Sequence, residues 1–196
     1  MDATAPHRLR IAITGAVQGV GFRPFVYRLA QEAGLSGSVR NTGAGVLIEA
    51  EGAASALAGF LDRLARDTPA HAVVTGREVA RMDALGTEGF TVAPSAAEDT
   101  CSAVVMTDLA TCPDCLREIC DAADRRYRYP FTTCVSCGPR YSVVAALPYD
   151  RASTTLNRFP PCSACAAEYA DPGSRRFHAE SICCPACGPQ IALWDA

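Results

Sequence analysis

The chain has 196 residues, of which 49% are apolar and 20% charged, and its formal net charge is −3. This composition is typical of an ordinary globular protein with one large or two small domains. The negative charge argues against nucleic acid as a partner, and a membrane is not expected because no apolar run approaches the roughly 18 residues of a spanning helix.

The first expected elements, in chain order, are a strand, a glycine-rich loop and a helix. Apolar and polar residues alternate over 9–13, which is strand periodicity. Apolar residues then recur at helical spacing from Phe22 to Ala33, and Gly34 supplies a helix stop. Between the two elements lie glycines at positions 15, 19 and 21.

A hairpin, a second helix and the closing strands follow. Residues 37–41 and 46–51 are separated by a turn and predict a hairpin. Helical spacing returns over 53–67, and short apolar runs near 73–79 and 90–92 suggest the closing strands.

The order of these elements predicts the fold class. Strand, helix, strand, strand, helix, strand indicates an α+β, ferredoxin-like sandwich, with one antiparallel sheet and two helices packed on one face. We assign it to residues 1–93. Residues 94–100 have the composition of a short linker, with a proline, a serine and small residues.

The stretch 15–23 has the composition of an anion-binding cradle. Glycine lets backbone N–H groups approach a ligand closely, and a helix start adds the positive end of its dipole. Arg23 adds a planar fork of donors that suits phosphate oxygens. All 18 basic residues are arginine, so a P-loop lysine and Schiff-base chemistry are excluded. The alternative is a plain glycine turn between a strand and a core helix.

This stretch resembles the acylphosphatase signature G-x-V-Q-G-V-G-F-R at every specified position. The resemblance implies that the loop backbone and Arg23 bind the phosphate, and that Asn41 orients the attacking water. Arg23 and Asn41 are therefore the expected catalytic pair, although an asparagine before a turn is more often structural. The implied phosphate-binding residues are Val17, Gln18, Gly19, Val20, Gly21, Phe22 and Arg23.

The cysteines dominate the rest of the chain. There are 11, and eight of them form four C-x-x-C pairs. Because the N-terminus carries no basic, apolar leader, we expect a reduced, cytoplasmic metal protein rather than a disulfide-stapled secreted one.

The C-x-x-C pairs belong to an internal duplication. In each copy 18 residues separate the two pairs, and the second copy follows the first by 50 positions. Glu118 recurs as Glu168, and Arg125-Arg126 recurs as Arg175-Arg176. We therefore expect a tandem zinc-finger domain over 101–196, with repeat units at about 108–141, here the first unit, and 158–191, here the second unit.

Each unit offers four thiolates, enough for one tetrahedral Zn²⁺, so two structural zinc ions are expected. Disulfides, a redox C-x-x-C and a crossed pairing between units are the alternatives; sequential pairing is favoured because each unit then closes only its own gap. Cys101, Cys120 and Cys183 are expected to be structural thiols, and His178 has an open role. The expected ligands are Cys112, Cys115, Cys134 and Cys137, and Cys162, Cys165, Cys184 and Cys187.

The two halves together resemble the N-terminal portion of the HypF family, the carbamoyltransferases of nickel–iron hydrogenase maturation. The resemblance implies hydrolysis of carbamoyl phosphate, or another acyl phosphate, to carbamate and phosphate. In the full-length family protein, ATP-dependent transfer of the carbamoyl group to HypE follows on further domains. It also implies that the chain is a fragment or a truncated relative.

Two other functions remain open at this point: a stand-alone acylphosphatase with a zinc module that binds a partner protein, and a zinc-finger nucleic-acid binder with an inert first domain. Because Arg23 and Asn41 both lie in the first domain, we expect that domain to keep its activity when zinc is removed.

Overall fold

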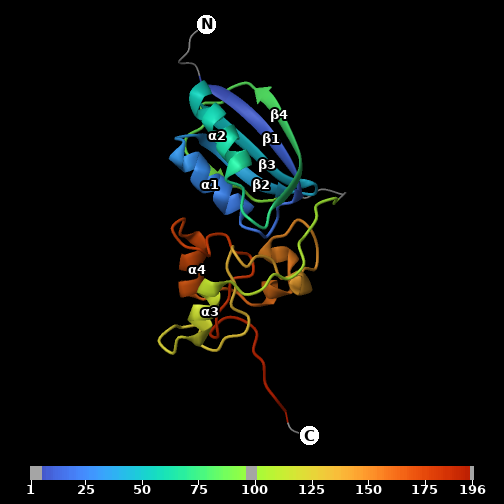
Figure 1. Ribbon diagram of the computed structural model, residues 1–196, viewed down its shortest axis with the longest axis vertical. Helices are drawn as coiled ribbons and strands as arrows, with labels where there is room; N and C mark the ends of the chain where they lie inside the picture. The colour runs from blue at the N-terminus through green and yellow to red at the C-terminus, as the bar shows by residue number, and fades with distance from the viewer. Residues whose placement is uncertain (1–5, 96–100, 195–196) are drawn as a thin grey trace.

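The computed structural model describes residues 6–95 and 101–194. Figure 1 shows two parts stacked along the long axis, a sheet with two helices at the N-terminal end and a loop-rich part below it. Residues 96–100, most of the expected linker, lie outside the described residues. None of the helices in the described ranges has the length and apolar character needed to cross a membrane.

The first part is a five-stranded sheet in the order β4-β1-β3-β2-β5. The pairs β1·β3, β1·β4 and β2·β3 are antiparallel, whereas the short β5 pairs in parallel with β2. The predicted α+β sandwich is thus confirmed, and the sheet is mixed rather than wholly antiparallel. The strands are β1 (His7–Ala16), β2 (Ser36–Thr42), β3 (Gly45–Gly52), β4 (Val73–Met82) and β5 (Phe90–Val92).

Two helices cover one face of this sheet, as predicted (Figure 1). Helix α1 (Phe22–Glu32) lies over β2 and β5, and α2 (Ala54–Arg66) lies over β1 and β3. Their apolar faces meet those of the strands in one buried cluster that includes Ile11, Leu29 and Phe60. Burial of each such side chain contributes about 1.5–3 kcal/mol, so the core fixes the positions of the β1–α1 loop and of β2.

The second part, here the zinc-finger part (residues 101–194), consists mainly of loops. It contains the helices α3 (Pro113–Cys120) and α4 (Ser163–Ala170) and the 3-10 helices η1 (Tyr141–Val143), η2 (Arg151–Ser153) and η3 (Thr155–Arg158). Helices α3 and α4 each have eight residues and each begin directly after the first cysteine of a unit. The duplication in the sequence is therefore also a duplication in structure.

Candidate functional site

The loop between β1 and α1, here the glycine loop (residues 17–21), needs glycine for two reasons. Gly19 has a φ of 75° and Gly21 a φ of 79°, which is the left-handed region that other residues rarely adopt. A Cβ on Gly19 would also lie 2.8 Å from the Cβ of Pro139, and one on Gly21 would lie 3.2 Å from the Cβ of Val135. The loop therefore has no side chain at positions 19 and 21, because the zinc-finger part packs directly against the backbone there.

Gln18 fixes this loop to its surroundings rather than facing a ligand. Its side chain is buried, and its amide nitrogen donates to the carbonyl oxygens of Thr42 and Gly45, each at 2.8 Å. Its amide oxygen accepts a hydrogen bond from the backbone N–H of Tyr149, also at 2.8 Å. One side chain thus joins the loop, the β2–β3 turn and the zinc-finger part.

Arg23 lies in the first turn of α1 and is only 8% exposed. Its Nη1 is 2.8 Å from Oδ1 of Asp150, and its Nη2 is 2.7 Å from Oε1 of Glu180. Nη2 also donates to the carbonyl oxygen of Tyr149 at 3.4 Å. The predicted phosphate-binding cation is therefore enclosed by two carboxylates from the zinc-finger part.

Asn41 is fully buried near the end of β2. Its amide nitrogen donates to the carbonyl oxygen of Tyr149 at 3.0 Å and to Oδ1 of Asp150 at 3.5 Å. Its Oδ1 has no hydrogen-bond partner within residues 6–95 and 101–194. The structure thus brings Arg23 and Asn41 to one carbonyl oxygen, and it leaves a buried acceptor beside them.

A cavity of about 20 Å³ lies between the loop glycines and Arg23 on one side and Tyr149 and Glu180 on the other. One water molecule needs roughly 10–15 Å³ measured in this way. The site in this arrangement accommodates a water molecule but not an acyl phosphate.

Glu180 is held from several directions. It is 5% exposed, its carboxylate accepts from the hydroxyl of Tyr169 at 3.1 and 3.2 Å, and its Oε2 accepts from the backbone N–H of Arg151 at 3.0 Å. Burial raises the pKa of Glu180, and the charge of Arg23 opposes this rise. The carboxylate is consequently fixed in position toward Arg23.

His178 lies behind Tyr169, with its Nδ1 at 3.1 Å from the hydroxyl. Burial, helped by the charge of Arg23, lowers the pKa of His178 to about 4, so the ring is neutral at pH 7. Both four-cysteine groups of the described residues are complete without it.

Sequence reasoning did not identify Tyr149, Asp150 or Glu180. Tyr149 and Asp150 lie between the two repeat units, where no motif marks them. Glu180 falls where the units diverge, because Pro130 stands at the equivalent position of the first unit. That departure from the repeat is the signal that could have found it.

The eight predicted cysteine ligands form two groups, one from each unit, as sequential pairing predicts. The Sγ atoms of Cys112 and Cys134 are 3.6 Å apart, and those of Cys162 and Cys184 are 3.7 Å apart. Four sulfurs at 2.3 Å from one Zn²⁺ in a tetrahedron are separated by about 3.8 Å. The spacing fits zinc, and the eight cysteines are not in disulfides.

Arginines of each unit donate hydrogen bonds to cysteine sulfurs of the other unit. Arg125 donates to Sγ of Cys165 at 3.4 Å, and Arg175 donates to Sγ of Cys115 at 3.2 Å. Four thiolates around one Zn²⁺ leave a net charge of −2, so a neighbouring guanidinium stabilises the ligand set.

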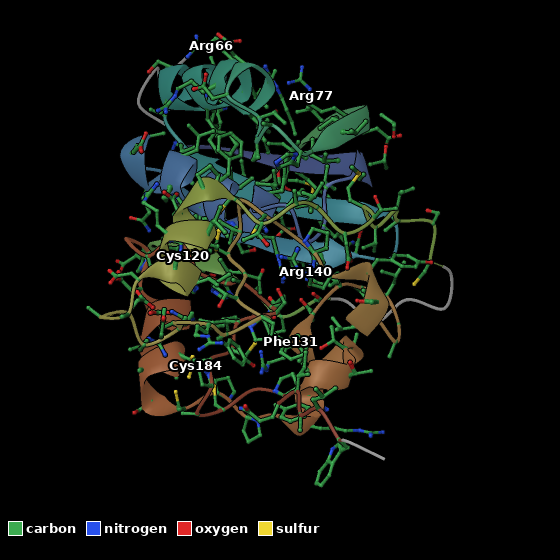
Figure 2. The ribbon with its side chains drawn as sticks, turned by 60° about the horizontal axis from the view of Figure 1, so that its bottom comes forward. Arg66, Arg77, Cys120, Phe131, Arg140 and Cys184 are labelled. Carbon is green, nitrogen blue, oxygen red and sulfur yellow. The ribbon has the colours of Figure 1, made fainter. Side chains whose placement is uncertain are left out.

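In Figure 2, Cys184 lies beside α4, at the opposite end of the molecule from Arg66 and Arg77.

The remaining cysteines lie outside both groups. Cys101 and Cys120 are exposed. Cys183 is buried beside Cys184, a predicted ligand, and its thiol donates to the carbonyl oxygen of Phe131 at 3.4 Å.

This combination defines a class of protein, an acylphosphatase-type domain joined to tandem four-cysteine zinc fingers. The acylphosphatase family matches residues 9–92, and the HypF finger matches residues 111–144 and 162–194. The chain belongs to the HypF family.

Individual relatives support the assignment. The carbamoyltransferase HypF2 of Cupriavidus necator is 53% identical over 163 residues, which are 78% of this chain and 19% of that protein. A crystal structure of full-length HypF in a phosphate- and nucleotide-bound form matches with a TM-score of 0.90 and 39% identity, covering 98% of this chain and 26% of that one. An acylphosphatase of Thermotoga maritima is 46% identical over 85 residues, which are 43% of this chain and 93% of that protein. The chain therefore spans about a fifth of the length of the curated HypF relatives it matches.

Proposed function

We propose that this chain hydrolyses carbamoyl phosphate to carbamate and phosphate. The observation that carries the proposal is the convergence of Arg23 and Asn41 on the carbonyl oxygen of Tyr149, beside the glycine loop. An enzymatic role agrees with the acylphosphatase family match and with the HypF relatives. The finer assignment to carbamoyl phosphate is drawn from those relatives, which are named as carbamoyltransferases.

The chemistry follows from the activated bond of an acyl phosphate. Backbone N–H groups of residues 17–22 and the guanidinium of Arg23 hold the phosphoryl oxygens, and Asn41 holds a water in line with the leaving group. The water oxygen attacks phosphorus, the bond to the carbamate oxygen breaks, and carbamate leaves with the bonding electron pair. Because the leaving group is already good, orientation and charge stabilisation supply most of the acceleration.

Substrate binding in this proposal requires Arg23 to change partners. Its donors now face Asp150 and Glu180, and the cavity of about 20 Å³ is too small for a phosphoryl group. Arg23 must turn from the carboxylates to the phosphoryl oxygens as the site opens by a few ångströms.

The zinc ions would have a structural role. Each four-cysteine group supplies a complete tetrahedral set, which leaves no coordination position for substrate. In the longer relatives, we propose, the carbamate is passed to domains that use ATP and transfer the carbamoyl group to HypE in the cytoplasm.

The experiment is phosphate release from carbamoyl phosphate by the zinc-loaded chain, corrected for spontaneous decomposition. Arg23→Ala and Asn41→Ala are the test variants, and Arg77→Ala, on the exposed strand β4, is the matched control. Wild-type release no faster than that of the two test variants would reject the site.

A further inference from the structure

Donors and acceptors are on opposite sides of the candidate site. The first domain contributes the guanidinium of Arg23 and the amide nitrogen of Asn41, which are donors, and the glycine loop, whose backbone N–H groups the proposed function assigns to the phosphoryl oxygens. The zinc-finger part contributes acceptors, namely the carbonyl oxygen of Tyr149 and the carboxylates of Asp150 and Glu180. The site therefore fits a ligand that accepts hydrogen bonds at one end and donates them at the other.

The acyl phosphates differ in this respect. Their phosphoryl groups offer only acceptors to a protein at neutral pH. Carbamoyl phosphate has an amino group at its acyl end, with two N–H donors, where acetyl phosphate has a methyl group of similar size. When the phosphoryl group lies on the glycine loop, the acyl end faces the residues across the cavity, which include Tyr149 and Glu180.

We propose that Glu180 and Asp150 select carbamoyl phosphate by accepting hydrogen bonds from its amino group. This inference rests on the proposed function. When Arg23 turns to the phosphoryl oxygens, it frees Oε1 of Glu180 and Oδ1 of Asp150, which now accept its N–H groups at 2.7 and 2.8 Å. The amino group of the substrate takes the place of the guanidinium.

Glu180 is suited to this role because it is held in place. Tyr169 and the backbone N–H of Arg151 occupy other sites on its carboxylate and remain when Arg23 leaves. The side chain is 5% exposed. With acetyl phosphate in the site, Arg23 would have left this buried carboxylate and no N–H donor of the substrate would replace it. A site that hydrogen-bonds a substrate N–H discriminates strongly against an analogue that lacks it, because its own polar groups are then unpaired.

The same contacts allow a different interpretation, in which the two carboxylates compete with every anion for Arg23 and do not distinguish one substrate from another. In that case their removal would raise turnover of carbamoyl phosphate and acetyl phosphate by the same factor. Selection predicts instead that the two substrates respond differently, so the ratio of their kcat/KM values separates the interpretations.

The experiment measures kcat/KM for carbamoyl phosphate and acetyl phosphate with the whole zinc-loaded chain. The variants are Glu180→Leu, which removes both acceptors, Glu180→Gln, which keeps one, and Asp150→Leu. Glu49→Gln is the control, because Glu49, on β3, pairs with Arg8 at 2.9 Å in a surface pocket lined by residues of the first part. Zinc content and thermal unfolding are measured for each protein.

The wild type is expected to prefer carbamoyl phosphate by about tenfold or more, since a hydrogen bond to a charged group is lost with acetyl phosphate. Glu180→Leu and Asp150→Leu should each lower that preference, with Glu180→Gln between wild type and Glu180→Leu. If Glu180→Leu fails to bind two zinc ions, the isosteric Glu180→Gln decides.

An unchanged substrate ratio in the folded variants, or equal kcat/KM values in the wild type, would overturn the selection while hydrolysis itself stands. A wild-type chain that hydrolyses neither compound would instead reject the proposed function.

Discussion

Arg126 of the first zinc-finger unit pairs with Glu168 of the second unit, with 2.6 Å between Nη2 and Oε2. The reverse pair joins Arg176 of the second unit to Glu118 of the first. Burial favours protonation of Glu118, but hydrogen bonds from Arg176 and Arg175 outweigh it and lower its pKa to about 2. Both pairs repeat at positions 50 apart, so the duplicated units brace each other reciprocally.

This bracing predicts that each unit controls the zinc affinity of the other. Arg126→Leu should weaken zinc binding by Cys162, Cys165, Cys184 and Cys187 by about 10- to 100-fold, the usual effect of losing a partner of a metal ligand. The reason is that Arg126 lies against Cys165 and Glu168, at 3.6 Å from the Cys165 sulfur. Chelator competition followed by alkylation and mass spectrometry of the released cysteines measures it.

The control for this experiment is Arg117→Leu, because among the described residues the ion pair of Arg117 is with Asp114 alone, on the exposed side of α3. Selective loss of zinc from the first unit, the one that carries the Arg126→Leu change, would contradict the reciprocal arrangement.

A second prediction separates the two candidate catalytic side chains. Arg23→Ala should weaken binding of inorganic phosphate and lower turnover by roughly a hundredfold or more, because Arg23 meets charge in the ground state and in the transition state. Asn41→Ala should lower turnover by a similar factor while phosphate still binds, because in the proposed mechanism Asn41 contacts the attacking water and not the phosphoryl group. Phosphate release and phosphate binding by calorimetry are the two measurements.

Equal loss of phosphate affinity in both variants would show that Asn41 also holds the anion. Variants that bind zinc normally and retain wild-type turnover would remove both residues from the mechanism.

A third prediction concerns the glycine loop. Gly19→Ala should destabilise the protein by more than about 1 kcal/mol, because the new Cβ meets Pro139 and Tyr149 in a left-handed backbone conformation. Gly59→Ala is the matched control: Gly59 lies in α2 with nothing within 4 Å of an added Cβ, so alanine there should stabilise by up to about 1 kcal/mol. Denaturant unfolding of both variants measures the difference, and equal effects would contradict the close packing of Gly19 against Pro139 and Tyr149.

The strands and helices of the first domain and the two four-cysteine groups could be predicted because each follows from a local pattern. Alternating residues over 9–13 give β1, helical spacing gives α1 and α2, and the repeated C-x-x-C pairs give the two four-cysteine groups. In each case the residues that define the feature are close in sequence or recur at a fixed interval, so no knowledge of tertiary contacts is needed.

The covering of Arg23 could not be predicted in this way. Its partners Asp150 and Glu180 are more than 120 positions away in the chain, and they reach it only because the zinc-finger part docks on the glycine loop. Docking depends on the shapes of two folded surfaces, which neither periodicity nor motif spacing encodes. The expectation that the halves act independently therefore overlooked contacts that join them at the candidate site.

A fourth prediction follows from that docking, and it concerns zinc removal. The zinc units bury few large apolar side chains, so metal binding supplies much of their folding energy, on the order of 10 kcal/mol or more. Chelation should therefore unfold the segments that carry Tyr149 and Glu180, while the core of the first domain keeps β1, β2 and α1 in place.

Arg23 on α1 and Asn41 on β2 then remain in a folded first domain without the acceptors that face them. We expect chelation to lower kcat/KM for carbamoyl phosphate by about tenfold more than that for acetyl phosphate, because only the amino group loses its partners. Amide hydrogen exchange of β1 to β3 verifies that the first domain stays folded, and restoring zinc should restore the preference. A chelated chain that is folded over residues 6–95 and still prefers carbamoyl phosphate would place the selectivity wholly within the first domain.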